Sequence, residues 1–266
     1  METEIDNKPP GFKVTLLILA IICLSFVIYY SVMSILGPGR KLAAIKNELG
    51  TARIEKKETD ERIYSDSAYL RLLKDRAFLQ ARIVLAETDS IYFTINLSDS
   101  TANIEISGVS VHTAKISSIR ASKILMKGDE NIIISMLSTP FTISSDIATI
   151  RKEPVMIKMA PKDTSEYKPD MMPDTSLTEP VNYIMEMTNG TKIYVYQEEV
   201  EKFSDRMNLF SFDINDRFRE TWRSLKRVFL FKVPEYHPYI KLRVPRSDAE
   251  IIYRAIPKYG QVAVFR

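Results

Sequence analysis

Cysteine is almost absent from this chain of 266 residues. The single cysteine, Cys23, lies inside a long apolar stretch near the N-terminus, so the rest of the chain has no cysteine nucleophile. Histidine is nearly as rare: only His112 and His237 occur, and neither belongs to an HExxH motif or another metal-ligand spacing. We therefore predict no cysteine catalysis in the soluble part, no metal site and no cofactor.

Glycine is also scarce, with 8 residues in the whole chain, and no glycine-rich phosphate loop joins a strand to a helix. This excludes the common nucleotide-binding folds. The net charge of +3 is small, and its 37 basic residues are mixed with 34 acidic ones, so nucleic acid is not predicted as a partner. A serine, aspartate or glutamate mechanism stays open, because only geometry would single out such residues.

Charge is missing altogether from residues 14–36, which form an apolar run of 23 residues. As a helix this run would be about 35 Å long, enough to cross a hydrocarbon core of about 30 Å. We predict a transmembrane helix at 14–36 in contact with the lipid bilayer, preceded by a short tail at 1–13. The alternative is a cleaved signal peptide, for which Val32-Met33-Ser34 would be the processing site.

The orientation of this helix depends on its flanking charges. Two lysines precede the run, Lys8 and Lys13, and four basic residues follow it, Arg40, Lys41, Lys46 and Arg53. Counted literally, this favours a cytoplasmic bulk. The absence of cysteine beyond the helix favours a periplasmic or other extracytoplasmic bulk, because stray thiols are a liability there. We expect a single-pass protein of the inner or cytoplasmic membrane with its bulk on the extracytoplasmic side.

A helical stalk is predicted at 40–87, after Gly37-Pro38-Gly39 ends the membrane helix. An interrupted heptad seam runs along it. Two interpretations remain open: an oligomerising stalk that contacts other envelope proteins or a second copy, or a helix that docks on the following domain. The candidate association residues are Leu42, Ile45, Leu49, Leu70 and Leu73.

Residues 90–159 carry strand signals. Apolar residues alternate with polar ones from Ile91 to Leu97, and a polar turn and Gly108 then separate further alternating segments, which predicts an antiparallel meander. Further strands are expected at 132–136 and 155–159. Residues 160–180 are dense in Pro, Asp, Ser and Thr and are predicted to be a linker or mobile loop.

Residues 181–266 predict an α+β region. A hairpin is expected around Asn189-Gly190, with a type I′ turn. A helix from about 200 to 229 has an aromatic stripe that we expect to pack on a sheet, with a membrane-surface or partner-binding face as the alternative. Its basic end, Arg219, Arg223 and Arg227, is a candidate site for an acidic partner. Strand, helix and strand follow, the helix starting with a capping box at Ser247–Glu250.

Two resemblances add to this prediction. Residues 92–100 and 103–109, within a segment of residues 91–116, resemble the opening hairpin of L,D-transpeptidase-type (YkuD-like) envelope domains. Those enzymes use a histidine and a cysteine in a Ser/Gly-rich motif that this chain lacks, so the resemblance implies a non-catalytic relative and no functional residue carries over. The layout of tail, span and stalk resembles bitopic cell-division scaffolds of the FtsL and DivIC kind.

The expected fold class is thus a single N-terminal transmembrane helix, a helical stalk, and an α+β domain with a mainly antiparallel sheet and a long amphipathic helix. The expected function is that of a non-catalytic bitopic envelope protein that presents this domain for protein contacts within a membrane-associated assembly. The alternative function is a cell-wall-acting envelope hydrolase or transferase, with its site between the strands and the 160–180 loop.

Overall fold

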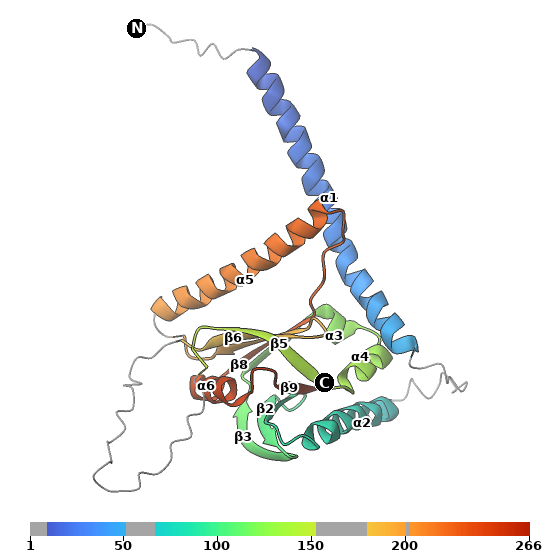
Figure 1. Ribbon diagram of the computed structural model, residues 1–266, viewed down its shortest axis with the longest axis vertical. Coiled ribbons are helices and arrows are strands. Elements are labelled where there is room, and N and C mark those ends of the chain that lie inside the picture. The colour runs from blue at the N-terminus through green and yellow to red at the C-terminus, as the bar shows by residue number, and fades with distance from the viewer. Residues whose placement is uncertain (1–9, 52–66, 153–179, 201–202) are drawn as a thin grey trace. The chain divides into compact units, whose positions relative to one another are not determined.

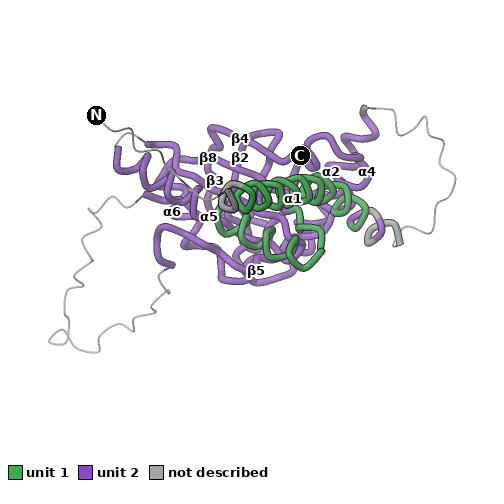
Figure 2. The backbone as a smooth tube through the Cα atoms, turned by 90° about the horizontal axis from the view of Figure 1, so that it is seen from above, with its two compact units in different colours: residues 1–44, 216–236 green, residues 45–215, 237–266 purple. Residues whose placement is uncertain are grey.

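The structure is a computed structural model that describes residues 10–51, 67–152, 180–200 and 203–266. The chain divides into two compact units, which we describe separately (Figure 2). Unit 1 comprises residues 1–44 and 216–236, and unit 2 comprises residues 45–215 and 237–266.

The elements are labelled in Figure 1. The helices are α1 (Pro10–Thr51), α2 (Ser67–Ala86), α3 (Lys123–Lys127), α4 (Glu130–Leu137), α5 (Phe203–Phe229) and α6 (Arg246–Ala255). The strands are β1 (Tyr92–Asn96), β2 (Thr101–Ile106), β3 (Val109–Lys115), β4 (Ser118–Ala121), β5 (Phe141–Ala148), β6 (Asn182–Met187), β7 (Lys192–Gln197), β8 (Tyr239–Val244) and β9 (Gln261–Phe265). The expected combination of an N-terminal apolar helix, further helices and a mainly antiparallel sheet is confirmed.

The helix α1 does not end at Gly37-Pro38-Gly39, contrary to the prediction. It continues through Pro38 to Thr51, as one helix of 42 residues. Proline has no backbone N–H, so the carbonyl of Ser34 lacks its usual helical donor, but one missing bond does not stop a helix whose other turns are intact. The predicted helix at 40–87 is represented by the end of α1 and by α2; residues 52–66 lie outside the described residues.

Unit 2 is built on a mixed sheet with the strand order β3-β2-β1-β9-β5-β6-β7-β8-β4. The pairs β1/β9 and β7/β8 are parallel, and the other neighbouring pairs are antiparallel. The predicted meander is present as β1, β2 and β3, and the predicted strand-helix-strand tail is present as β8, α6 and β9. The C-terminal strand β9 lies in the middle of the sheet, between β1 and β5.

The two faces of the sheet are covered by different helices. Side chains from α3, α4 and α6 join the larger core, where Phe93, Ile193 and Ile252 are fully buried. On the opposite face, Ala81 and Leu85 of α2 pack on Tyr92 and Ala263. Helix α2 therefore docks on the domain that follows it, the second of the two interpretations of the predicted stalk. Burial of each large apolar side chain contributes about 1.5–3 kcal/mol.

The first part of α5 also covers this second face. Its Leu209 and Phe212 pack on a cluster formed by Ile184, Tyr194 and Tyr196 of β6 and β7. The hydroxyl of Tyr196 donates a hydrogen bond of 2.8 Å to Asp213, also on α5. The residues of α5 that contact the sheet are therefore not those of the aromatic stripe.

The hairpin β6–β7 forms as predicted, but its turn type was wrong. A type I′ turn needs positive φ at both central residues, and only Gly190 has it, with φ of 80°. The amide of Gly190 bonds the carbonyl of Met187, and the amide of Met187 bonds the carbonyl of Thr191, which gives a three-residue loop that ends in a left-handed glycine. Positive φ at two consecutive turn residues occurs instead at Ser107 and Gly108, between β2 and β3.

Two further local predictions were wrong. Residues 132–136 lie in α4, because Asp129 caps the helix by accepting a bond from the amide of Asn131, and Ile133 and Leu137 face the core one turn apart. The capping box at Ser247–Glu250 does not form, since α6 starts at Arg246 with Pro245 as its N-cap residue and no side-chain cap bond. The strand predicted at 155–159 and nearly all of the 160–180 loop lie outside the described residues.

A buried carboxylate fixes α2 on the sheet. Glu105 pairs with Tyr92 of β1 and shares its face of the sheet, under α2, so that only 2% of it is exposed. Its oxygens accept bonds from Arg82 of α2 at 2.9 and 3.0 Å and from the hydroxyl of Thr94 at 2.8 Å. Burial, and then the charge of Glu105, raise the pKa of the neighbouring Tyr92.

We predict that Arg82→Ala lowers the free energy of unfolding by about 2 kcal/mol, because it leaves the Glu105 carboxylate buried without its cation. In a Glu105→Gln background the same substitution should cost much less. Chemical unfolding of the full-length protein in detergent measures both. The exposed Arg120 gives a control, since Arg120→Ala should change stability by less than about 0.5 kcal/mol. Equal costs of Arg82→Ala in the two backgrounds would contradict the assignment.

Candidate interaction surfaces

Helix α1 exposes most of the apolar side chains of its membrane-length run. Val14, Leu19, Leu24 and Ile35 are all more than half exposed. Residues 14–45 form a helix long and apolar enough to cross a membrane, a test that a signal sequence near an N-terminus also passes. In water this surface would be strongly unfavourable.

Within unit 1, the segment that follows α5 packs on α1. Phe229 stacks on Phe26 with ring centroids 5.0 Å apart, and Phe231 contacts Tyr29 edge-on at 6.2 Å. Gly37 allows the chain to approach, because a Cβ placed there would lie 3.2 Å from the carbonyl oxygen of Pro234. The sequence suggested a turn at Gly37, whereas its role is to allow this close contact.

The aromatic stripe of α5 is exposed, so the expectation that it packs on a sheet was wrong. Leu209 and Phe212 make the sheet contact from a different side of the helix. The stripe and the turn after it form a row of apolar side chains that are 45% to 83% exposed: Phe203, Met207, Phe210, Ile214, Phe218, Trp222, Phe229, Leu230 and Phe231. This row is continuous enough to be an interaction surface.

The basic end of α5 is paired with acidic residues of the same unit. Arg219 contacts Asp216 at 2.6 Å, Arg223 contacts Glu220 at 3.2 Å, and Arg227 binds Glu235. These are mostly short-range helical pairs at the surface, worth a few tenths of a kcal/mol each. An acidic partner at Arg219, Arg223 and Arg227 remains a prediction, and it would have to compete with these carboxylates.

Unit 2 has an exposed apolar surface on α2 and β3, which we call the α2–β3 surface. Its members are large side chains that are 46% to 66% exposed: Leu72, Leu79, Ile83, Val84, Val109 and Val111. The C-terminal end of α2 lies beside the turn that leads into β3, since Arg82 bonds Glu105 at the end of β2 and a Cβ on Gly108 would lie 3.6 Å from that of Ala86. Spacings of seven and four place Leu72, Leu79 and Ile83 on one helical face.

The predicted association residues lie elsewhere. Ile45 is buried, Leu42, Leu70 and Leu73 are half-buried, and the side chain of Leu49 is outside the described residues. The sequence prediction missed the exposed row of α2, because its neighbours Leu70 and Leu73 continue the heptad pattern that begins at Leu42. The 7-and-4 spacing from Leu72 was the signal that would have found it.

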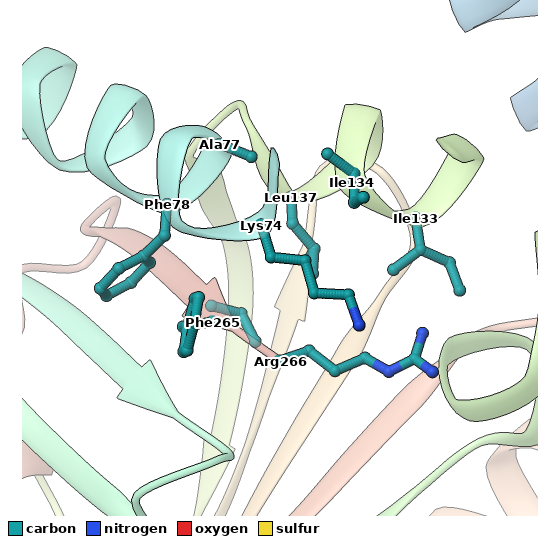
Figure 3. Close-up of a pocket in the computed structure, with 9 residues that line it drawn as sticks. Lys74, Ala77, Phe78, Ile133, Ile134, Leu137, Phe265 and Arg266 are labelled. Carbon is teal, nitrogen blue, oxygen red and sulfur yellow. The ribbon is translucent and has the colours of Figure 1, made fainter. Parts of the chain in front are cut away.

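Two hollows lie beside α2. The smaller, between α2, α4 and β9, is lined by Phe78, Leu137, Phe265 and other mainly apolar side chains, with Lys74 and Arg266 at its rim (Figure 3). Its volume of about 10 Å³ holds at most one water molecule. The larger is an open groove of about 800 Å³ between α2 and the β1–β2 turn, lined by both basic and acidic side chains, including Arg71 and Asp75.

The strongest cluster of titratable side chains joins β5 to α6. The hydroxyl of Tyr253 donates a bond of 2.8 Å to Asp146, and the Lys152 amine lies 3.8 Å from the same carboxylate and 4.8 Å from the centre of the Tyr253 ring. Burial lowers the pKa of Lys152, against the opposing effect of Asp146. Burial and the bond to Asp146 raise the pKa of Tyr253, and burial raises that of Tyr183, which packs on it.

This cluster suits a structural role better than acid-base chemistry. A tyrosine with a raised pKa stays protonated and acts as a donor, and Asp146 is the only carboxylate among the cluster's described residues.

The two histidines lie in structural positions. Nε2 of His112 lies 3.2 Å from Asp248 without forming a hydrogen bond, and Nδ1 of His237 lies 2.9 Å from the carbonyl oxygen of Gly190. Among the described residues no group of three metal-ligating side chains occurs.

We predict that the stability of unit 2 falls as pH rises above about 10, the pKa of an unfolded tyrosine. Tyr183 and Tyr253 have higher pKa values when folded, so the folded state keeps protons that the unfolded chain loses. Tyr253→Phe should flatten the decline, whereas Tyr259→Phe, at an exposed site, should not. Unfolding measured at several pH values between about 8 and 11 checks this. Identical slopes for Tyr253→Phe and the wild type would contradict it.

Gly37 and Gly39 provide a matched pair for the contact in unit 1. Gly37→Leu should displace residues 229–236 from α1, because the new side chain meets the Pro234 carbonyl, whereas nothing lies within 4 Å of a Cβ at Gly39. Both substitutions raise helix propensity equally, by about 1 kcal/mol. The measurement is bismaleimide crosslinking between cysteines placed at Phe26 and Phe229 in a Cys23→Ser background. The yield should fall several-fold with Gly37→Leu alone, and equal yields would contradict the contact.

No protein-family model, no curated protein and no solved structure matches this chain. The resemblances to L,D-transpeptidase-type domains and to bitopic division scaffolds therefore remain predictions. The function has to be argued from the surfaces described above.

Proposed function

We propose that this protein is a single-pass membrane protein of the cell envelope whose α+β domain binds other proteins, as a non-catalytic component of a membrane-associated assembly. The observation that carries this proposal is the α2–β3 surface, a row of exposed apolar side chains on a domain whose sheet already has packed cores on both faces. Apolar surface that the domain does not need for its own core is typical of a protein interface.

The membrane part of the proposal is supported by α1, which is long and apolar enough to cross a bilayer and exposes its apolar side chains. An extracytoplasmic bulk is supported by the lack of cysteine after Cys23. In this orientation the helix holds the domain at the outer surface of the cytoplasmic membrane, within reach of other envelope proteins.

The proposed contact is centred on α2 and on β3, an edge strand of the described sheet. Val109 and Val111 of β3 are both exposed, and Val111 is the extra residue of a bulge, since Ser110 pairs with Glu105 and His112 with Ile104. An edge strand with exposed β-branched side chains can pair with a strand of a partner, while Leu79 and Ile83 offer apolar contacts beside it. Leu42, Ile45, Leu49, Leu70 and Leu73 remain predicted association residues.

The second candidate function is an envelope hydrolase or transferase acting on cell-wall material. The observation that favours it is the cluster of Asp146, Lys152 and Tyr253, because pKa values shifted from their usual range gather at functional sites. Its weakness is the single carboxylate, since hydrolysis of glycosidic bonds ordinarily uses two.

We expect Leu79→Glu to abolish capture of a stoichiometric partner by the full-length protein, since a charge in an apolar interface costs at least about 2 kcal/mol, more than a tenfold loss of affinity. Gln80→Glu is the matched control: the neighbouring residue is also exposed and gains the same side chain, but it lies off the line formed by Leu72, Leu79 and Ile83. The measurement is crosslinking in intact cells, affinity purification in detergent and quantitative mass spectrometry.

Recovery of a membrane or envelope protein with the wild type and with Gln80→Glu, but not with Leu79→Glu, would support both the function and the surface. Equal recovery with both variants would leave a binding function but place it elsewhere on the chain. Recovery of the protein alone would contradict the proposal and favour the enzyme, to be tested with Asp146→Asn on cell-wall substrates.

A further inference from the structure

The C-terminal half of α5 and the turn after it present aromatic side chains to their surroundings within unit 1. Phe218, Trp222 and Phe229 lie on one helical face, because they are separated by four and seven residues. They are 70%, 62% and 63% exposed, and Leu230 and Phe231 extend the row. Five large apolar side chains in a row of 14 residues need a cover that the described part of unit 1 does not supply.

The position of this row along α1 suggests the cover. A bilayer core is crossed by about 20 helical residues, so a span that begins at Val14 ends near Met33. At 1.5 Å per residue, Tyr29 then lies about 6 Å inside the hydrocarbon boundary and Phe26 about 10 Å inside. Their contacts Phe231 and Phe229 must lie at similar depth. Helices that lie in a membrane surface bury their apolar face by about the same 5–10 Å.

The direction of α5 agrees with this depth. Figure 1 shows the C-terminal end of α5 meeting α1 partway along that helix, and within unit 1 residues 216–229 lead away from α1 and do not run beside it. An element that leaves a membrane-crossing helix sideways runs along the membrane plane. The exposed Arg217 lies outside the apolar row, and Lys226 lies at its edge, four residues after Trp222; the long side chains of both can reach the headgroups.

The turn after α5 holds an aromatic residue in a strained backbone conformation. The amides of Phe231 and Lys232 bond the carbonyls of Val228 and Arg227, the pattern of a Schellman motif. The residue in its left-handed position is ordinarily glycine, but here it is Phe231, with φ of 56° and 83% exposed. A bulky residue is strained at this φ, and apart from its edge contact with Tyr29 the side chain gains little burial within the described residues in return.

From these observations we infer that residues 216–231 form an interfacial membrane helix and tip, with Phe218, Trp222, Phe229, Leu230 and Phe231 immersed in the outer part of the bilayer that α1 crosses. This inference rests on the proposed membrane span. The inferred partner is lipid, because the row is continuous with the contacts of Phe26 and Tyr29 inside the apolar run. An amphipathic aromatic residue such as Trp222 is typical of this depth.

The test needs no substitution, because Trp222 is the only tryptophan of the chain. The full-length protein is reconstituted into vesicles of phosphatidylcholine and phosphatidylglycerol. Trp222 emission should be blue-shifted, and it should be quenched by lipids brominated near the headgroup end of the acyl chain more than by lipids brominated near the bilayer centre. Quenching by aqueous iodide should be at least about fivefold weaker than for N-acetyltryptophanamide, because the indole is immersed.

Two variants sharpen the result. Phe218→Asp should make Trp222 more accessible to iodide, because a charge one turn away lifts this part of the helix from the lipid, whereas Asn208→Asp, which adds the same charge at an exposed polar position of α5, should not. In a Trp222→Phe background, Phe231→Trp should report quenching by lipid at least as strong as that of Trp222.

The outcomes separate this inference from the proposed function. Protein that is stripped from the vesicles by alkaline carbonate would overturn the membrane span itself. Protein that stays integrated while Trp222 is open to iodide would overturn only the interfacial helix. Protection from both iodide and brominated lipid would show that a protein, such as a second copy, covers the row, and would also overturn the inference.

Discussion

The cost of exposing apolar surface to water is the constraint on which unit 1 depends. Each large apolar side chain left in water forgoes about 1.5–3 kcal/mol compared with burial, and both α1 and α5 present whole rows of such residues. The contacts of Phe229 and Phe231 with α1 bring the two rows together at one level of the apolar run. A single apolar medium at that level would satisfy both rows.

Unit 2 obeys a different constraint, the need to cover both faces of its sheet. α6 and α4 complete one face, whereas α2 and the beginning of α5 cover the other. The buried Glu105 makes the position of α2 specific, since its charge is satisfied only when Arg82 is beside it. With α2 held in this position, Leu72, Leu79 and Ile83 face outward, and the candidate protein-binding surface is a consequence of the core.

Local patterns predicted the elements well where period and length agreed. The alternation at 91–97, the helical period at 203–229 and the strand-helix-strand tail all form. Short apolar segments were less reliable: residues 132–136 suit a strand as well as a helix, and the Asp129 cap together with the core contacts of Ile133 and Leu137 decide for a helix. The predicted type I′ turn at Asn189-Gly190 was also wrong, because the dipeptide alone does not set the length of the loop. The backbone hydrogen bonds of Met187 with Gly190 and Thr191 set it to three residues.

The sequence by itself determined that a membrane-length apolar helix precedes an α+β domain, and that cysteine and nucleotide-loop chemistry are missing, because these depend on composition and on local spacing. Only the tertiary structure decided which side of an amphipathic helix is covered. Periodicity shows that α5 has an apolar row, but the sheet is contacted by Leu209 and Phe212 and the row stays exposed. Gly37 likewise suggested a turn in the sequence, whereas in the structure it is a site of close packing. The sequence pattern around Gly37 could not show this, because its neighbour Pro234 is almost two hundred residues away in the chain.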